Sequence, residues 1–145
     1  MVTRHAQWGI MLKHNHIAIV VAVILHQVIG FLWYSPFLFL GPWVQGLGKQ
    51  VSELDMSNPA PFLADIVGWF FTCYFISWLV QRVPLTTFNQ GLGFAILLWV
   101  GVALPLLAPH YLFAGLHTNV LLVDAMNALV QLAVTCCLLT VWRRR

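Results

Sequence analysis

The sequence predicts an all-α, polytopic membrane protein with four transmembrane helices and an interfacial segment after the first helix. Composition is the first observation behind this fold class. The 145 residues are 61% hydrophobic and only 8% charged, whereas soluble domains are about 45–50% apolar and about 25% charged. The second observation is that four apolar runs each approach the length of about 20 residues that crosses a bilayer. Backbone hydrogen bonds in lipid must be satisfied within each segment, so each run is expected to form a helix.

The four predicted spans form one transmembrane domain, residues 17–142, between a basic N-terminal segment (1–16) and a basic tail (143–145). The spans cover residues 17–34, 62–80, 91–109 and 119–142. Asn58 and Pro59 predict the start of the second span as N-cap and first-turn proline. Thr87 and Gln90 predict a capping box before the third span. That span contains Pro105, which is expected to bend it, and small residues that favour close helix packing, namely Gly91, Gly93, Ala95, Gly101 and Ala103.

The first span ends in the aromatic stretch GFLWYSPFLFLGPW, residues 30–43. Trp33, Tyr34 and Trp43 are expected to be interfacial anchors, because amphipathic rings favour the headgroup level of a membrane. Trp142 has the same expected role after the fourth span. Two prolines then interrupt the helix, and the residues between them are too few to span a bilayer. This segment is therefore expected to lie in the interface or to fold back onto the bundle.

The distribution of Lys and Arg predicts the orientation of the helices. With four spans, six of the seven basic residues fall on one side of the membrane, namely Arg4, Lys13, Arg82, Arg143, Arg144 and Arg145. Lys49 falls on the other side, with Glu53 and Asp55. Since positive residues are enriched in cytoplasmic loops, we expect a multi-pass protein of the cell (inner or plasma) membrane with both termini in the cytoplasm.

Three short motifs resemble a known group of sequences. Gly-Phe-Leu-Trp-Tyr-Ser-Pro ends the first span, Tyr-Leu-Phe-x-Gly occupies 111–115, and Val-Asp-Ala occupies 123–125. Together with Gly41 and Trp43, these motifs resemble the small four-helix membrane proteins of domain-of-unknown-function family 1761, over a region from Ile17 to the C-terminus. In that family an aromatic–histidine pair often follows the fourth-helix aspartate, whereas this chain has Met126-Asn127. The resemblance implies an architecture and carries no activity.

Polar side chains inside the spans are the candidate functional residues, because such groups are costly in lipid and usually face a bundle interior or a cavity. On the fourth span Asp124, Asn127, Gln131 and Thr135 recur at helical spacing and form one stripe. We expect a polar pocket in the outer half of the bundle, lined by His26, Asp65, Asp124, Asn127 and Gln131. Asp65 is also near enough in depth to share a proton with Asp124. His110 and His117 are expected in the turn above this pocket.

The leading functional hypothesis is a non-enzymatic protein that binds or passes a small solute, ion or proton through this pocket. A structural or accessory membrane subunit, whose polar residues only hold helices together, is the alternative. A membrane subunit that carries a metal or haem on His26, His110 and His117 is the third, although these histidines lack paired helical spacing. We expect no resident cofactor, no metal and no nucleic-acid partner; the expected partners are the lipid bilayer and a second copy or an accessory-subunit partner.

The sequence contains no nucleotide-binding loop and no nucleophile with its base, which argues against an enzyme. Three cysteines, Cys73, Cys136 and Cys137, all lie in apolar runs. An odd number without a C-x-x-C motif predicts neither a disulfide framework nor a zinc site. They are expected to be small buried hydrophobic residues.

Reporter fusions test the predicted topology. A reporter that is active only in the cytoplasm should be active when fused after Arg145 and silent when inserted next to Lys49, because the basic residues favour the cytoplasmic side. Reporter activity and protein level are measured together for both fusions. The reverse pattern would invert the predicted orientation.

Overall fold

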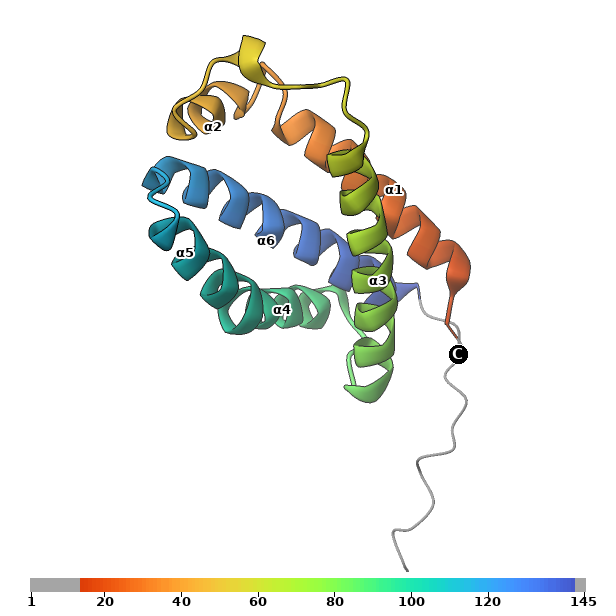
Figure 1. The fold of residues 1–145 in the computed structure, drawn as a ribbon. Coiled ribbons are helices and arrows are strands. Elements are labelled where there is room, and N and C mark those ends of the chain that lie inside the picture. The colour runs from red at the N-terminus through yellow and green to blue at the C-terminus, as the bar shows by residue number, and fades with distance from the viewer. Residues whose placement is uncertain (1–13, 143–145) are drawn as a thin grey trace, which may run out of the picture.

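The computed structural model of the protein describes residues 14–142, so the predictions made for residues 1–13 and for the tail 143–145 lie outside the described residues. The described part contains helices and turns and no strand (Figure 1). Its elements are α1 (His16–Trp33), α2 (Leu40–Gly46), the 3₁₀ helix η1 (Val51–Glu53), α3 (Ala60–Arg82), α4 (Phe88–Leu98), the π-helix η2 (Trp99–Ala103), α5 (Leu104–Phe113) and α6 (Thr118–Val141).

Four helical segments in the described residues are long and apolar enough to cross a membrane, which confirms the predicted fold class. They are His16–Trp33, Ala60–Arg82, Phe88–Phe113 and Thr118–Val141. The predicted capping box is present, since Thr87 accepts a hydrogen bond from the Gln90 N–H and the Gln90 side chain accepts one from the Thr87 N–H. The Asn58 side chain accepts from the Ala60 N–H at 3.0 Å, at the first residue of α3.

The third long segment is a composite of α4, η2 and α5. The π-helix η2 ends just before Pro105, whose ring would clash with the carbonyl four residues earlier and which has no N–H to donate. A π-bulge relieves both problems and is a recognised cause of helix bending. The helix then continues past Pro109 to Phe113, so the prediction that His110 lies in the turn before α6 was wrong.

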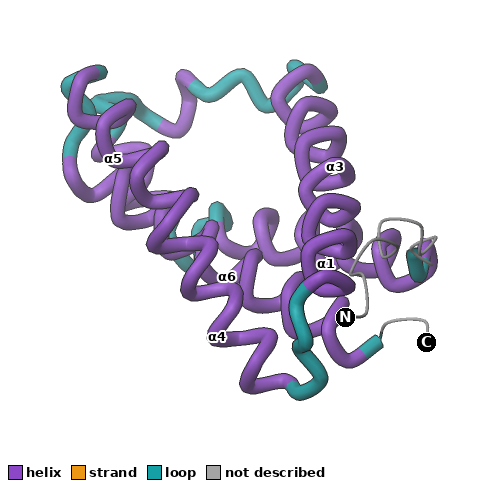
Figure 2. Tube along the Cα trace, turned by 90° about the horizontal axis from the view of Figure 1, so that it is seen from below, coloured by secondary structure: helices purple, strands orange, loops and turns teal. Residues whose placement is uncertain are grey.

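α6 is the central helix of the bundle and packs against α1, α2, α3, α4 and α5 (Figures 1 and 2). Eleven of its residues are buried, compared with four in α1 and four in α3. Cys136 and Cys137 are among them, and Cys73 of α3 is buried too. All three cysteines are free, as small core residues of this kind are expected to be.

The segment after α1 folds back onto the bundle. Val44 of α2 is buried, and α2 packs against α6. The ring of Trp43 lies 5.1 Å from that of Tyr34, whereas Phe37 is 93% exposed and faces away. We call the end of the bundle that carries α2, η1 and the α5–α6 turn the α2 end. At the opposite end, the Asn15 side chain donates to the Trp142 carbonyl at 2.8 Å.

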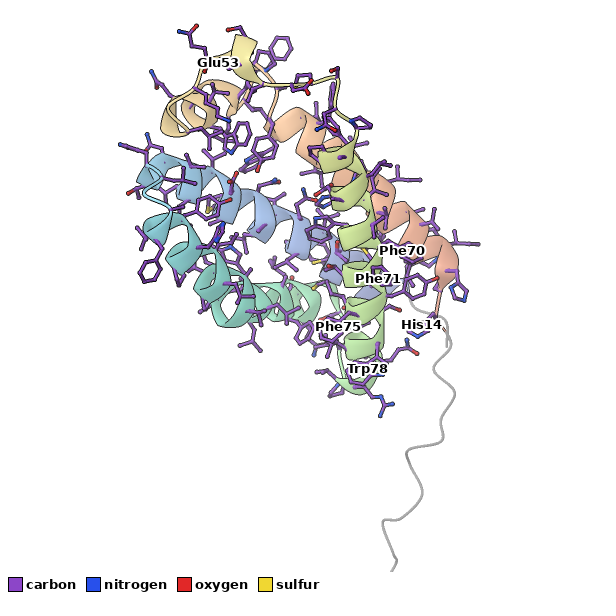
Figure 3. The ribbon with its side chains drawn as sticks, in the orientation of Figure 1. His14, Glu53, Phe70, Phe71, Phe75 and Trp78 are labelled. Carbon is purple, nitrogen blue, oxygen red and sulfur yellow. The ribbon has the colours of Figure 1, made fainter. Side chains whose placement is uncertain are left out.

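Aromatic side chains follow the exposed side of α3 (Figure 3). Phe71 is 66% exposed and Phe75 is 56% exposed, and the Arg82 guanidinium lies 5.3 Å from the centre of the Trp78 ring. So large an exposed apolar surface on a water-soluble monomer would be unusual. It is the kind of surface that a helix presents to lipid.

The closest approach of α4 to α6 depends on a single glycine. A Cβ atom on Gly91 would lie 3.0 Å from the Cys137 Cα and 3.1 Å from the Cys136 carbonyl oxygen. At Gly93 and Gly101 a Cβ would meet nothing within 4 Å. Of the small residues predicted to bring helices together, Gly91 and the buried Ala95 therefore lie at the contact, while Gly93 and Gly101 do not.

Gly91→Ala should destabilise the protein by about 1–3 kcal/mol, because overpacking pushes two helix backbones apart. Gly93→Ala is the matched control on the same helix. It should be neutral or should stabilise by up to about 1 kcal/mol, because alanine has the higher helix propensity and the site is open. Thermal unfolding in detergent, followed by circular dichroism, measures both. Equal effects of the two substitutions would contradict the close approach.

Candidate functional site

Asp124 lies at the centre of a group of hydrogen bonds near the α2 end. The Tyr34 hydroxyl donates to its Oδ1 at 2.6 Å, and the Tyr111 hydroxyl donates to its Oδ2 at 2.7 Å. These lengths are typical of a hydroxyl that donates to an ionised carboxylate. Asp124 is six residues from the first residue of α6, which corresponds to a depth of about 9 Å along the helix. Tyr34 directly follows α1 and Tyr111 lies in α5, so the carboxylate joins three long segments.

A chain of hydrogen bonds leads from Asp124 along α6. The Asn127 amide donates to the Tyr34 hydroxyl oxygen at 3.2 Å, and the Gln131 amide donates to the Asn127 side-chain oxygen at 3.1 Å. Asn127 and Gln131 are both buried. Every donor in this chain points towards Asp124, in the order Gln131, Asn127, Tyr34. We call Tyr34, Tyr111, Asp124, Asn127 and Gln131 the Asp124 cluster.

Two tryptophan indoles fix the backbone of α6 on either side of Asp124. The Trp33 Nε1 donates to the Val123 carbonyl at 3.1 Å, and the Trp99 Nε1 donates to the Ala125 carbonyl at 2.7 Å. Each indole also places a large apolar ring against the bundle, as expected for tryptophan with a buried hydrogen-bond partner. The position of the carboxylate is therefore set by contacts to both neighbouring residues.

A second polar group joins α1 to α3. His26 Nε2 lies 3.1 Å from Asp65 Oδ2, and the Gln27 amide donates to the same oxygen at 2.8 Å. His26 is buried and its ring lies on that of Trp69, with 3.9 Å between ring centres. The Asp65 side chain is 47% exposed, so one end of this pair reaches the surface of the bundle.

The structure places the five predicted pocket residues in two groups. Asn127 and Gln131 join Asp124, whereas His26 pairs with Asp65. The suggestion that Asp65 shares a proton with Asp124 was wrong, because its oxygens are bonded to His26 and Gln27. Sequence reasoning missed Tyr111 altogether and assigned Tyr34 only an anchoring role. Both tyrosines stand in motifs that the sequence already singled out, at 30–36 and 111–115.

The histidines named for a metal or haem site are not brought together. His26 contacts Asp65, His110 is exposed on α5, and His117 caps α6 by accepting from the Asn119 N–H at 3.2 Å. Among residues 14–142, no three His, Cys, Asp or Glu side chains are grouped closely enough to hold a metal ion.

The two other acidic residues of the described chain are satisfied locally. Glu53 accepts from the Gln50 N–H at 2.7 Å. Asp55 accepts from the Ser57 hydroxyl at 2.6 Å, and this hydrogen bond lowers the pKa of the exposed Asp55 carboxyl below its usual value.

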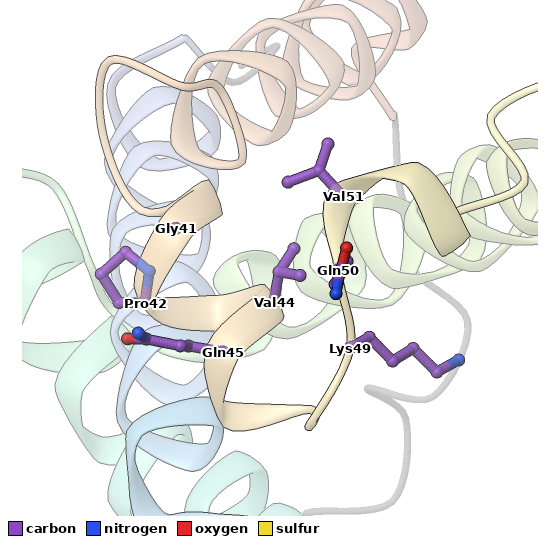
Figure 4. A pocket seen from close by; sticks show the side chains of 7 residues that line it. All are labelled: Gly41, Pro42, Val44, Gln45, Lys49, Gln50 and Val51. Atoms are coloured by element: carbon purple, nitrogen blue, oxygen red, sulfur yellow. The ribbon is translucent and has the colours of Figure 1, made fainter.

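A hollow of about 360 Å³ lies between α2 and η1 (Figure 4). It is lined by Gly41, Pro42, Val44, Gln45, Lys49, Gln50 and Val51. None of the predicted pocket residues lines it.

No basic side chain balances the charge of Asp124 within the described residues. The Lys and Arg residues there are Lys49 and Arg82. Lys49 lines the hollow beside α2, and Arg82 lies over Trp78 at the opposite end. Among the described residues, the imidazole that lies beside a carboxylate is that of His26, whose Nε2 is 3.1 Å from Asp65 Oδ2. Neutral donors alone stabilise the Asp124 carboxylate.

Tyr34→Phe should destabilise the protein more than Tyr111→Phe. The first substitution removes the donor to Asp124 and also the acceptor of Asn127, while the second removes one donor only. At about 0.6 kcal/mol per bond, rising to about 1.7, the loss for Tyr34→Phe should be roughly twice that for Tyr111→Phe. Chemical unfolding in mixed micelles measures both.

Tyr74→Phe is the control for this comparison. Its hydroxyl contacts His16 at an exposed position, 2.8 Å away, so its loss should cost less than either. A larger effect of Tyr111→Phe than of Tyr34→Phe would contradict the proposed chain.

Comparison with known proteins gives one match. No curated protein matches the chain, and no solved structure does. Residues 17–140 match the family described as "Protein of unknown function (DUF1761)". The match includes all four long helical segments except for a few terminal residues. It also includes the three motifs that carry Tyr34, Tyr111 and Asp124, as the resemblance predicted. The chain belongs to the DUF1761 family.

Proposed function

We propose that this protein binds a small monovalent metal cation at Asp124 and that it is not an enzyme. The observation that supports the proposal is the carboxylate of Asp124, held by two phenol hydroxyls within a membrane-spanning bundle without a basic partner in the described chain. Ionisable residues in transmembrane segments are costly and often mark sites for ions or protons. A net negative charge at this depth attracts a cation.

The convergence of three motifs supports a specific role for this position. Tyr34, Tyr111 and Asp124 come from three separate segments, and each segment is one that resembles the family. Helix packing alone would be served by hydrogen bonds anywhere along α6.

A structural role is the second candidate, and a specific observation favours it. Both oxygens of Asp124 already accept hydrogen bonds from neighbouring segments, so the cluster ties α1 and α5 to α6. Under this reading the protein is an accessory membrane subunit, and the carboxylate only holds helices together. Passage of a solute across the membrane would require more than binding.

Asp124→Asn separates the two candidates. The amide oxygen can accept from Tyr34, and the amide N–H can donate to the Tyr111 oxygen, so the fold should persist. Wild-type protein should gain thermal stability when Li⁺, Na⁺ or K⁺ replaces N-methylglucamine at constant ionic strength and pH. A ligand at 100 times its Kd stabilises by about 2.7 kcal/mol. Asp124→Asn should fold and lose this response.

Asp55→Asn is the matched control, since it removes one carboxylate from an exposed loop at the same end of the bundle. It should keep the full response. Wild-type protein that responds to none of the three cations would support the structural candidate. A response that persists in Asp124→Asn would place the site elsewhere.

A further inference from the structure

Four buried side-chain atoms of residues 14–142 have no hydrogen-bond partner in the protein, namely His26 Nδ1, Gln131 Oε1, Trp43 Nε1 and Thr140 Oγ1. His26 Nδ1 and Gln131 Oε1 lie on facing helices, α1 and α6. The His26 residue is 5% exposed and Gln131 is 2% exposed. An unpaired buried polar atom costs about 1–3 kcal/mol. If His26 Nδ1 and Gln131 Oε1 lie close to each other, one bound molecule can satisfy both atoms.

The register of α1 against α6 places them at the same level. The helices run antiparallel, since Trp33 contacts Val123 at the α2 end and Asn15 contacts Trp142 at the other. Counted seven residues from the Trp33–Val123 contact, the position on α6 opposite His26 is residue 130. Counted eleven residues from the Asn15–Trp142 contact, it is Gln131. The Gln131 amide also lies 3.7 Å from where a Cβ on Gly30, one turn from His26, would be.

The proton positions make both atoms acceptors. His26 Nε2 faces the Asp65 carboxylate, which can only accept when ionised, so Nε2 carries the proton. Nδ1 is buried without an acceptor and therefore presents a lone pair. Gln131 uses its amide N–H on Asn127, so its Oε1 also presents lone pairs. Two acceptors cannot bond to each other, and a molecule with two donors is needed between them.

We propose that one water molecule binds between His26 Nδ1 and Gln131 Oε1 and donates a hydrogen bond to each. Buried waters typically make two to four such bonds to otherwise unpaired polar groups, and water is the smallest molecule with two donors. The bound water joins the His26–Asp65 pair to the Asp124 cluster. The result is one hydrogen-bonded chain from the half-exposed Asp65, through His26, water, Gln131, Asn127 and Tyr34, to Asp124.

This chain deepens the proposed function and rests on it for its role, because it connects the carboxylate of Asp124 to the carboxylate of Asp65 through hydrogen bonds. The bonds from Gln131 to Asp124 all donate in one direction, so each polarises the next. A cation at Asp124 weakens that polarisation along the whole chain. The water site itself needs no cation.

Solid-state NMR of ¹⁵N-histidine-labelled protein in lipid bilayers tests the water. In the wild type, His26 Nδ1 should be unprotonated and should receive polarisation from water protons, with the signal assigned by its disappearance in His26→Phe. The signal should be lost in Gln131→Met, which keeps the side-chain length and removes the acceptor. Thr140→Val is the control: it removes another unpartnered buried oxygen of α6, far along the helix, and should leave the signal unchanged.

A wild-type Nδ1 that carries a proton, or that receives no polarisation from water, would overturn the proposal, and this measurement stands even if Gln131→Met does not fold. An unchanged signal in folded Gln131→Met would also overturn it. The cation response of Asp124 is measured separately. Its absence with the water signal present would remove the proposed function and leave the water site.

Discussion

The need to satisfy polar groups inside an apolar bundle governs this structure, and α6 is where that need is greatest. The helix carries a stripe of polar side chains, Asp124, Asn127, Gln131 and Thr135, through the middle of an apolar bundle. Lipid offers such groups no hydrogen-bond partner, so they must be satisfied inside the bundle. The stripe therefore requires α6 to be surrounded by the other helices. It also determines which of their residues face it, namely Tyr34, Tyr111 and the indoles of Trp33 and Trp99.

Two kinds of contact hold the other helices to α6, hydrogen bonds near one end and close packing of small residues near the other. Near the α2 end, the hydroxyl of Tyr34 and the indole N–H groups of Trp33 and Trp99 donate hydrogen bonds to α6, so directional bonds hold the helices there. Near the opposite end, Gly91 lets the backbones of α4 and α6 come into contact, and Cys73, Cys136 and Ala95 belong to the packed apolar core. In lipid this packing is stabilised by van der Waals contact, since burial from lipid gives little hydrophobic gain.

Most of the fold could be predicted from the sequence, but only Asp124, Asn127 and Gln131 of the Asp124 cluster could be. Apolar length and helix caps are local signals, so the four helical segments and the Thr87 capping box could be read directly. The extension of α5 through Pro109 could not, because a proline ends most helices and the π-bulge that accommodates Pro105 has no local signature. Depth along a helix was also informative, since it placed His26, Asp65 and Asp124 in one half of the bundle. Depth alone does not say which helices are neighbours, and so it could not separate the His26–Asp65 pair from the Asp124 cluster.

The tyrosines show why the remaining part of the site was missed. An aromatic residue at the end of a span satisfies the rule for interfacial anchors, and Tyr34 fits that rule as well as Trp33 does. What distinguishes it is the hydroxyl, which the interface could solvate but which the structure aims at Asp124. Phenylalanine at 34 would supply the same apolar surface without the donor. The same holds for Tyr111 in a helix whose neighbours Leu112 and Phe113 are exposed and apolar. Where one span carries an unpaired carboxylate, a tyrosine at a similar depth on another span is therefore the residue to look for in the sequence. Phenylalanine would serve apolar packing equally well, so the tyrosine hydroxyl indicates a hydrogen bond to that carboxylate.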